Sequence, residues 1–369
     1  MTNEDVIGIT NSFNTFYEGI EDITDYYLKK KLERLKSKNY TSIDTMVFND
    51  YTIQPTDLDI SIEEVPNNIF ENFTTQIATF PIESQIGRKI TIGVKENNTN
   101  TWLGFIRISS PVSSIKPRND YFGMTLPLDI VNRHFYNGQT IVPVQPFGFN
   151  YLGGKLLALI CQSNEVKQIF DERYNTDICV FETTSLYGSS KSSSMYDGLE
   201  PYIKFKGLTQ SKNILTPTDE IYFNMRDKIR VEYGKEEWNN SVVNPKGSSP
   251  KTRELNKLLQ ILKSEVKNID VELFNKLTDV IKNKSTTLQQ KRYYISTFGN
   301  TNVPQFILEN EVLNNPNKEK YNLENIITYW KNKSQKRWNK LNQEQQIKKE
   351  LELYSLQNLN QGINFNIIR

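Results

Sequence analysis

The sequence contains very little cysteine and almost no histidine. Its 369 residues include two cysteines, Cys161 and Cys179, and one histidine, His134. The absence of a Cys/His cluster argues against a structural zinc site, and one histidine leaves little room for a Ser-His-Asp triad. We predict no metal site, although a cation held by carboxylates and tyrosines stays an alternative. Both cysteines lie in apolar segments and are expected to be buried, reduced thiols, and we expect His134 to be packed among aromatic residues.

Long apolar runs are also missing. No run reaches the ~18 residues of a membrane-spanning helix, and the N-terminus, MTNEDVIGIT, lacks the basic region and apolar core of a signal peptide. We therefore expect a cytoplasmic protein without a membrane partner. The 45 basic and 43 acidic residues leave a net charge of +2, which argues against strong non-specific nucleic-acid binding by the whole chain.

The most sharply patterned stretch runs from residue 141 to residue 207. It predicts an apolar strand at 141–144, a turn rich in glycine and aromatic residues, one long amphipathic helix, a strand at 178–183, a serine-rich loop and a strand at 202–206. The apolar residues of the helix recur at spacings of three and four: Leu152, Leu156, Leu159, Ile160, Val166, Ile169 and Phe170.

Two glycines, Gly153 and Gly154, occupy the first turn of that helix. Each costs about 1 kcal/mol relative to alanine, so some other requirement must favour them. One explanation is an anion site, because amides at a helix N-terminus bind phosphate and Lys155 adds a positive charge. The other explanation is close packing of the turn against a neighbouring strand. The GxxxxGK[ST] spacing of a P-loop is absent.

Hydroxyls, tyrosines and carboxylates gather after the second strand. Residues 182–190 read ETTSLYGSS, and residues 195–199 read MYDGL. Polar groups at the end of a central strand are typical of functional sites in mixed sheets. A serine-rich loop with capping residues would give the same pattern, but the convergence of so many polar groups favours a site.

Several ordered motifs in this part of the chain resemble the Druantia A-protein family. They are GGKLLAL, FETTSLYG, SxxYDGL and KxxGLT, preceded by WLGFI at 102–106 and SSPV at 109–112. The resemblance covers residues 88–212, about a third of the chain. That family is linked to bacterial anti-phage defence and occurs in phages. The resemblance therefore implies a role in phage–host conflict and a location in the bacterial host cell, with a bacterial or phage gene.

The order of elements also resembles a GNAT acyltransferase core and the Mom-type DNA-adenine modification proteins built on that plan. In a GNAT, the turn before the long helix holds the pyrophosphate of acyl-CoA through backbone amides. This chain has FNYLGGK where a GNAT usually has R/QxxGxG/A. The resemblance implies acyl-CoA or a related nucleotide as donor, held by Phe147, Gly148, Tyr151, Leu152, Gly153, Gly154 and Lys155.

The same resemblance assigns roles to the polar loops. A loop predicted at 110–125 would border the acceptor, where Lys116 and Arg118 could contact a phosphate backbone; a solvated loop is the alternative. The proton-handling, catalytic groups would be Glu182, Tyr196 and Asp197. Ser185 and Tyr187 would line the pocket.

A helical, basic region ends the chain. Helices are predicted at 250–266 and 271–282, and the last strong segment, 324–356, combines Trp330 and Trp338 with basic residues. Such a face binds nucleic-acid backbone and offers rings for stacking. Alternatively, the tryptophans pack inward while the lysines face solvent. The residues predicted to bind nucleic acid are Lys333, Lys336, Arg337 and Lys340.

These patterns predict an α+β fold: a GNAT-like mixed α/β core at 86–243 between an N-terminal extension, 1–85, and a helical basic region, 251–369. The leading hypothesis is a GNAT-like transferase that modifies bases of DNA or another nucleic acid. The alternative is a non-catalytic factor with the same core, phage- or virion-associated, that binds nucleic acid or a phage or host protein.

Overall fold

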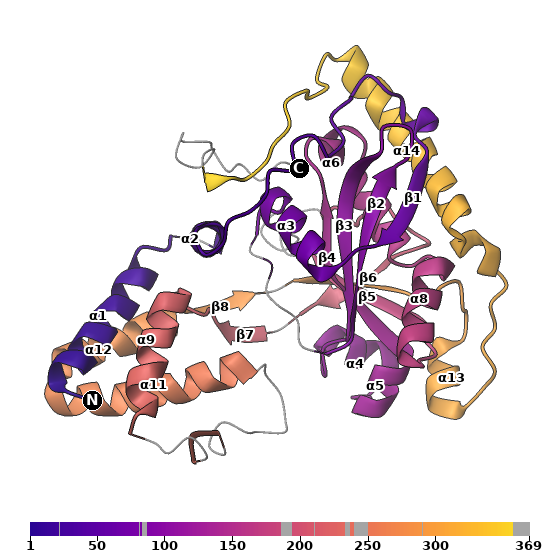
Figure 1. The fold of residues 1–369 in the computed structure, drawn as a ribbon. Helices are drawn as coiled ribbons and strands as arrows, with labels where there is room; N and C mark the ends of the chain where they lie inside the picture. Colours follow the sequence, from indigo (N-terminus) through magenta and orange to yellow (C-terminus); the bar gives the residue numbers. More distant parts are fainter. Residues whose placement is uncertain are drawn as a thin grey trace. The chain divides into compact units, whose positions relative to one another are not determined.

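A computed structural model describes residues 1–21, 23–80, 82, 87–185, 194–209, 211–232, 237–239, 250–289 and 291–356. They form an α+β protein with a seven-stranded mixed sheet and a two-stranded sheet (Figure 1). This confirms the predicted fold class. By compactness the chain divides into two units, one of residues 1–33 and 210–290 and the other of residues 34–209 and 291–369.

The first unit is mainly helical. Its elements are α1 (Asn3–Glu18), α9 (Asp219–Arg230), α11 (Pro250–Ile269), α12 (Val271–Asp279), the π-turn η2 (Val280–Lys284), and the paired strands β7 (Ser211–Ile214) and β8 (Thr286–Gln289). The apolar stripe of α11 is buried against α1, α9 and α12. The spacing of Tyr17, Ile20, Ile23 and Tyr27 predicts a helix within residues 14–38 with these residues on one face. Helix α2 (Ile23–Lys36) lies in that range, but α1 ends at the Gly19 C-cap, so Tyr17 and Ile23 belong to different helices.

The second unit contains the seven-stranded sheet. Its order is β1-β2-β3-β4-β5-β9-β6, and β4 and β5 form the parallel pair while the other described pairs are antiparallel. Alternating residues at 88–94 and 102–109, joined by the turn sequence NNTN at 97–100, predict an antiparallel hairpin. The β2–β3 pair confirms it, with Asn100 in the left-handed region that the turn requires. The strands are β1 (Ile60–Glu64), β2 (Lys89–Glu96), β3 (Thr101–Ser109), β4 (Phe135–Pro143), β5 (Val180–Ser185), β6 (Lys204–Leu208) and β9 (Arg292–Ser296).

Helices cover both faces of this sheet. Phe105 and Val142 belong to the core that α3 (Asn67–Ile77) completes, whereas Ile106 and Ile141 belong to the core of α7 (Gly153–Ile160) and α8 (Asn164–Tyr174). Alternate residues of a strand point to opposite faces. The remaining helices are η1 (Pro55–Asp57), α4 (Lys116–Phe122), α5 (Leu128–His134), α6 (Phe147–Asn150), α13 (Val303–Glu309), η3 (Lys318–Tyr321) and α14 (Leu323–Gln343).

Two local predictions are corrected. The single long helix is two helices, since the Ser163 side chain caps α8 by accepting a hydrogen bond from the Val166 amide at 3.2 Å. The predicted loop at 110–125 contains α4, which has Pro117 in its first turn and ends at Gly123 with a left-handed φ of 71°. Lys116 and Arg118 therefore lie on a helix.

The packing predictions for the two cysteines and for His134 are confirmed. Cys161 and Cys179 are free and buried, and burial raises the pKa of both thiols. The His134 Nδ1 lies 2.8 Å from the Asp177 carbonyl oxygen, and its ring meets Phe306 edge to face. No helix in the described part of the chain has the length and apolar character needed to cross a membrane.

Candidate functional site

The parallel strands β4 and β5 pair only at their beginnings. Their register runs from Phe135↔Val180 to Asn137↔Glu182, three residue pairs. Beyond these, β4 stays with β3 and β5 stays with β9. The Thr183 hydroxyl donates to the Gly138 carbonyl at 2.8 Å where this pairing ends. The carboxyl ends of the two strands thus follow separate partners, and such ends are where open mixed sheets place ligands.

Asp197 is the centre of a polar network near the carboxyl end of β5. One carboxylate oxygen accepts from the Tyr294 hydroxyl at 2.7 Å and from Arg292 at 3.1 Å, and the other accepts from the Ser194 amide at 2.9 Å. Arg292 Nε also donates to the Tyr294 hydroxyl at 2.8 Å. Burial opposes ionisation, but these hydrogen bonds outweigh it and lower the pKa of Asp197. The group is therefore a carboxylate at neutral pH.

Tyr196 lies beside this network. Its ring packs edge to face on Tyr294, with centroids 5.4 Å apart, and its phenol hydrogen-bonds to the Thr183 side chain. Burial raises the pKa of Tyr196 far above its usual value. The side chain is therefore a neutral phenol that carries a proton. The structure brings Tyr196 and Asp197 together on the β5–β9 part of the sheet.

Lys155 joins the start of α7 to the Asp197 turn. Its ammonium group donates to the Asp197 carbonyl oxygen at 2.6 Å. Burial, followed by the nearby charge of Lys333, lowers the pKa of Lys155, while Asp197 opposes the shift. Two cations from α7 and α14 are therefore close enough to repel each other beside the predicted donor turn.

The glycines of the donor turn are explained by close packing. A Cβ on Gly153 would lie 2.5 Å from the Phe147 ring, and a Cβ on Gly154 would lie 2.0 Å from the Met195 methyl group. Leu152 precedes them in the left-handed region at φ 57°. Close packing therefore accounts for both glycines without any ligand, but the tightest contacts are with Phe147 on α6 and with Met195, and not with the neighbouring strand that the sequence suggested.

The C-terminal helix α14 covers the same turn. The Trp330 Nε1 donates to the Leu152 carbonyl at 3.2 Å, and the Ser334 hydroxyl donates to the Tyr151 carbonyl at 2.7 Å. Trp330 is buried in the main core and packs against Phe147. Helix α14 lies against η1, α6 and α7 (Figure 1), so it forms part of the wall of the site.

The four basic residues predicted to bind nucleic acid all lie on α14. Lys333 lies over the Tyr329 ring at 5.2 Å, and Arg337 lies over the Phe149 ring at 4.8 Å. Lys336 is exposed, and Lys340 is exposed within 3.8 Å of a Glu344 carboxylate oxygen.

Glu182 and Arg118, which were predicted to have separate roles, form one buried ion pair. Their nitrogen and oxygen lie 3.1 Å apart, and both side chains are at most 2% exposed. Tyr293 donates to Glu182 at 2.7 Å, and Arg118 also donates to two carbonyl oxygens of the segment before α4, those of Val112 and Ser113. Burial raises the pKa of Glu182, against the lowering effect of Arg118.

The remaining predicted residues are dispersed. Ser185 is buried at the end of β5 opposite Arg292. Lys116 is exposed on α4, 2.8 Å from Asp120. Tyr187 lies outside the described residues. The structure does not place Lys116 within the Asp197 network.

Arg292 and Tyr294 are site residues that the sequence pattern did not identify. They lie in β9, about a hundred positions after Asp197 in the chain. The only local signal was the basic and aromatic run KRYY at 291–294, with its strand-like alternation. Lys333 was predicted to contact nucleic acid, but its proximity to Lys155 was not foreseen.

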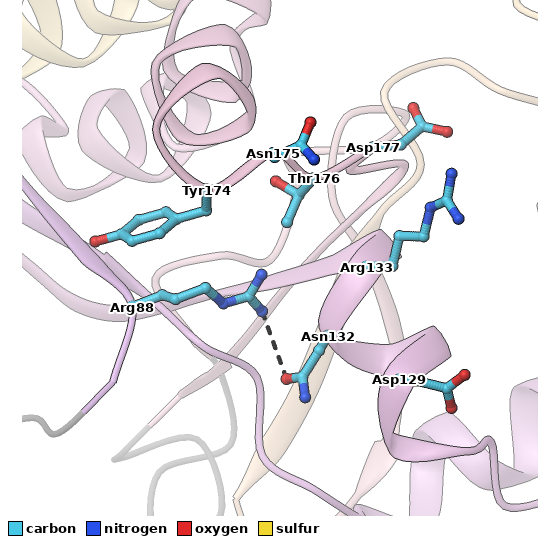
Figure 2. A pocket seen from close by; sticks show the side chains of 8 residues that line it. All are labelled: Arg88, Asp129, Asn132, Arg133, Tyr174, Asn175, Thr176 and Asp177. Carbon is cyan, nitrogen blue, oxygen red and sulfur yellow. Dashed lines mark hydrogen bonds between the residues drawn. The ribbon is translucent and has the colours of Figure 1, made fainter.

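A separate polar pocket of about 460 Å³ lies beside the residues that precede β4 and β5. In Figure 2 Arg88 points toward Asn132, and their nitrogen and oxygen lie 3.4 Å apart. The pocket contains acidic as well as basic side chains. It is lined by Arg88, Asp129, Asn132, Arg133, Tyr174, Asn175, Thr176 and Asp177. None of these is a predicted site residue, and the pocket adjoins the opposite strand ends from Asp197.

The fold and the cluster define an α+β protein with a polar site at the separated carboxyl ends of two parallel strands. The family model described as Druantia protein DruA matches residues 18–283, and the chain belongs to this family. No curated protein and no solved structure matches the chain. The matched range contains Lys155, Tyr196 and Asp197 but ends before β9 and α14. Across the described residues, no group of three or more His, Cys, Asp or Glu side chains is placed to hold a metal ion.

Proposed function

We propose that the protein is a transferase with a GNAT-like core that modifies bases of a nucleic acid. The observation that carries this proposal is the Asp197–Tyr196–Lys155 cluster beyond the short β4–β5 pairing. The resemblance of the element order to GNAT enzymes supports the same reading. Membership in the Druantia family supports a setting of antiviral defence.

The donor's phosphates would lie at the turn formed by residues 147–155. The N-terminus of a helix favours an anion, α7 begins in this turn at Gly153, and Lys155 and Lys333 supply positive charge. The Met195 methyl group lies beside Gly154. A donor that approaches the backbone at this position would therefore displace the Met195 side chain, which is flexible and 40% exposed.

Acyl transfer from a thioester to an amine forms an amide bond, breaks the carbon–sulfur bond, and needs one proton removed from nitrogen and one delivered to sulfur. Asp197, a carboxylate at neutral pH, would accept the first proton. Tyr196, a neutral phenol, would deliver the second. Glu182 is enclosed by Arg118 and Tyr293 and would contribute by holding α4 in place. The basic residues of α14 would contact the phosphate backbone.

Nucleoside mass spectrometry tests this proposal. DNA and RNA from cells that express the wild type would be compared with those from cells that express Tyr196→Phe or Asp197→Asn. We expect a new nucleoside with the wild type only. Asp227→Asn, which alters an exposed carboxylate on α9, is the matched control and should retain the product. Unchanged nucleosides with a folded wild-type protein would contradict the transferase.

A second candidate function is a binding protein without catalysis. It is favoured by the contact between Met195 and Gly154 and by the cover that Trp330 and Ser334 provide over the donor turn. Isothermal titration with acyl-CoA separates the two functions. Saturable binding that Lys155→Met weakens supports the transferase, and the absence of donor binding supports the binding protein.

A further inference from the structure

The strand β6 is at one end of the seven-stranded sheet and carries an exposed aromatic ring between two lysines. Phe205 is 42% exposed, and Lys204 and Lys206 flank it in the chain. The pairing of β6 with β9 shifts register between Phe205 and Gly207, so Lys206 occupies a β-bulge. Bulges re-aim side chains next to functional sites, and here Lys206 lies over the Tyr121 ring at 4.1 Å.

Phe205 is directly connected to the Asp197 network through Arg292. The Arg292 guanidinium lies 4.2 Å from the centre of the Phe205 ring, and the same group donates to Asp197 and Tyr294. Phe205 also lies opposite Tyr294 in the β6–β9 register, with ring centroids 5.7 Å apart. The ring and the guanidinium therefore form one surface that extends from the sheet edge to the proposed proton acceptor.

The charges around this surface are mainly positive. Arg292 lies on the same face of the sheet as Phe205. Lys204 pairs with Ile295 and Lys206 lies over Tyr121, so both lysines belong to the other face of this edge strand. The charge of Lys204 helps to lower the pKa of Lys206 after the larger effect of burial. The nearby carboxylates are Asp197, which Arg292 neutralises at 3.1 Å, and Glu200. A partner with regularly spaced negative charges and flat apolar groups complements this arrangement.

We propose that Phe205 and Arg292 form a stacking platform for an unpaired base of a single-stranded nucleic acid, whose backbone crosses the edge strand so that its phosphates contact Lys204 and Lys206 on the other face. Aromatic rings and arginine planes stack on any base, and lysines follow the backbone. The proposal rests on the proposed function in one respect: a base on this platform has its edge near Asp197. The same lysines disfavour the addition of a protein strand, because charges on an edge strand oppose pairing.

The test compares two fluorescein-labelled strands of equal length, oligo-dT and an abasic strand, by anisotropy at one fixed salt concentration. Both strands carry the same phosphates, so their difference isolates stacking. Removing one stacked base contact lowers affinity by about 5- to 150-fold. We expect the wild-type protein to prefer oligo-dT by that factor, and Phe205→Leu to bind both strands equally.

The chain provides a matched control in Phe223. It is 40% exposed on α9, and Arg226 lies 4.5 Å from its ring centre. Phe223→Leu should retain the preference for oligo-dT. Equal wild-type affinity for both strands, binding to neither strand, or a Phe205→Leu protein that keeps the preference would overturn the platform.

A second variant protects the test against a folding defect in Phe205→Leu. Lys204 is exposed, and Lys204→Ala should lower the affinity for both strands by the same factor and reduce the salt dependence of binding.

Nucleoside mass spectrometry on the same proteins separates the two proposals. If Phe205→Leu makes a modified nucleoside as well as the wild type does, the transferase proposal stands and the stacking-platform proposal is wrong. If binding depends on the bases but no modified nucleoside is made, the stacking-platform proposal stands and the transferase proposal is wrong.

Discussion

Tyr293 and Tyr294 are neighbours in β9, yet they donate hydrogen bonds to carboxylates on opposite faces of the sheet. Tyr293 donates to Glu182 and Tyr294 donates to Asp197, each at 2.7 Å. The alternation of a strand thus assigns one tyrosine to the enclosed ion pair with Arg118 and the other to the open network with Arg292. Substitutions at these neighbours should therefore have different effects.

The first prediction concerns the two tyrosines. Tyr293→Phe removes a hydrogen bond from a buried carboxylate and should lower the free energy of unfolding by about 1–3 kcal/mol. Tyr294→Phe should lower the free energy of unfolding by less than about 1 kcal/mol, because Asp197 is partly exposed and water can replace the hydroxyl. Urea unfolding followed by circular dichroism measures both values. Equal losses would contradict the assignment of the two tyrosines to different environments.

The second prediction compares two cations on α4. Arg118→Met leaves Glu182 buried without its partner and should destabilise the second unit by about 3–5 kcal/mol. Lys116→Met removes an exposed pair with Asp120 and should cost at most about 1 kcal/mol. Thermal unfolding of both variants beside the wild type provides the comparison. If Arg118→Met unfolds at the same temperature as the wild type, the ion pair does not hold α4 to the sheet.

The third prediction is a pH dependence. The folded protein lowers the pKa of Asp197, so ionised Asp197 stabilises the folded state above the unfolded pKa of about 3.9. That contribution is lost as the pH falls through the lower, folded pKa. The stability gap between the wild type and Asp197→Asn should therefore be largest near neutrality and shrink below about pH 4. Unfolding temperatures at a series of pH values measure the gap; a constant gap would contradict the lowered pKa.

The fourth prediction separates the two glycines of α7. Gly153→Ala brings its Cβ against the buried Phe147 ring and should cost about 1–3 kcal/mol. Gly154→Ala meets only the end of the flexible Met195 side chain and regains about 1 kcal/mol of helix propensity. We expect Gly154→Ala to leave the free energy of unfolding almost unchanged. Adding Met195→Ala to Gly154→Ala should raise that free energy. Chemical denaturation of the single and double variants decides whether packing accounts for these glycines.

Local patterns were sufficient for several elements. The β2–β3 hairpin followed from alternating residues around an asparagine-rich turn, and α12 followed from a short apolar periodicity. Where two local signals competed, the prediction was wrong. The apolar spacing from Leu152 to Phe170 continued across Ser163, which instead ended the periodic stretch by capping α8.

The composition of the polar loop identified Tyr196 and Asp197 as candidate site residues, and nothing in that loop indicated what they would bind. Arg292 and Tyr294 belong to a strand that follows residues 210–290, the second segment of the helical unit. Only their pairing with β5 brings them to Asp197. The same holds for Lys333, which reaches Lys155 because α14 packs on α7.

The sequence by itself determined the α+β class and the burial of both cysteines, because each depends on neighbours a few residues apart. Only the tertiary structure decided that Glu182 and Arg118 share a buried pair, that Asp197 is held by Arg292 and Tyr294, and that Phe205 is exposed beside them. Strand order and register set these contacts, and both arise from the packing of segments that are far apart in the chain.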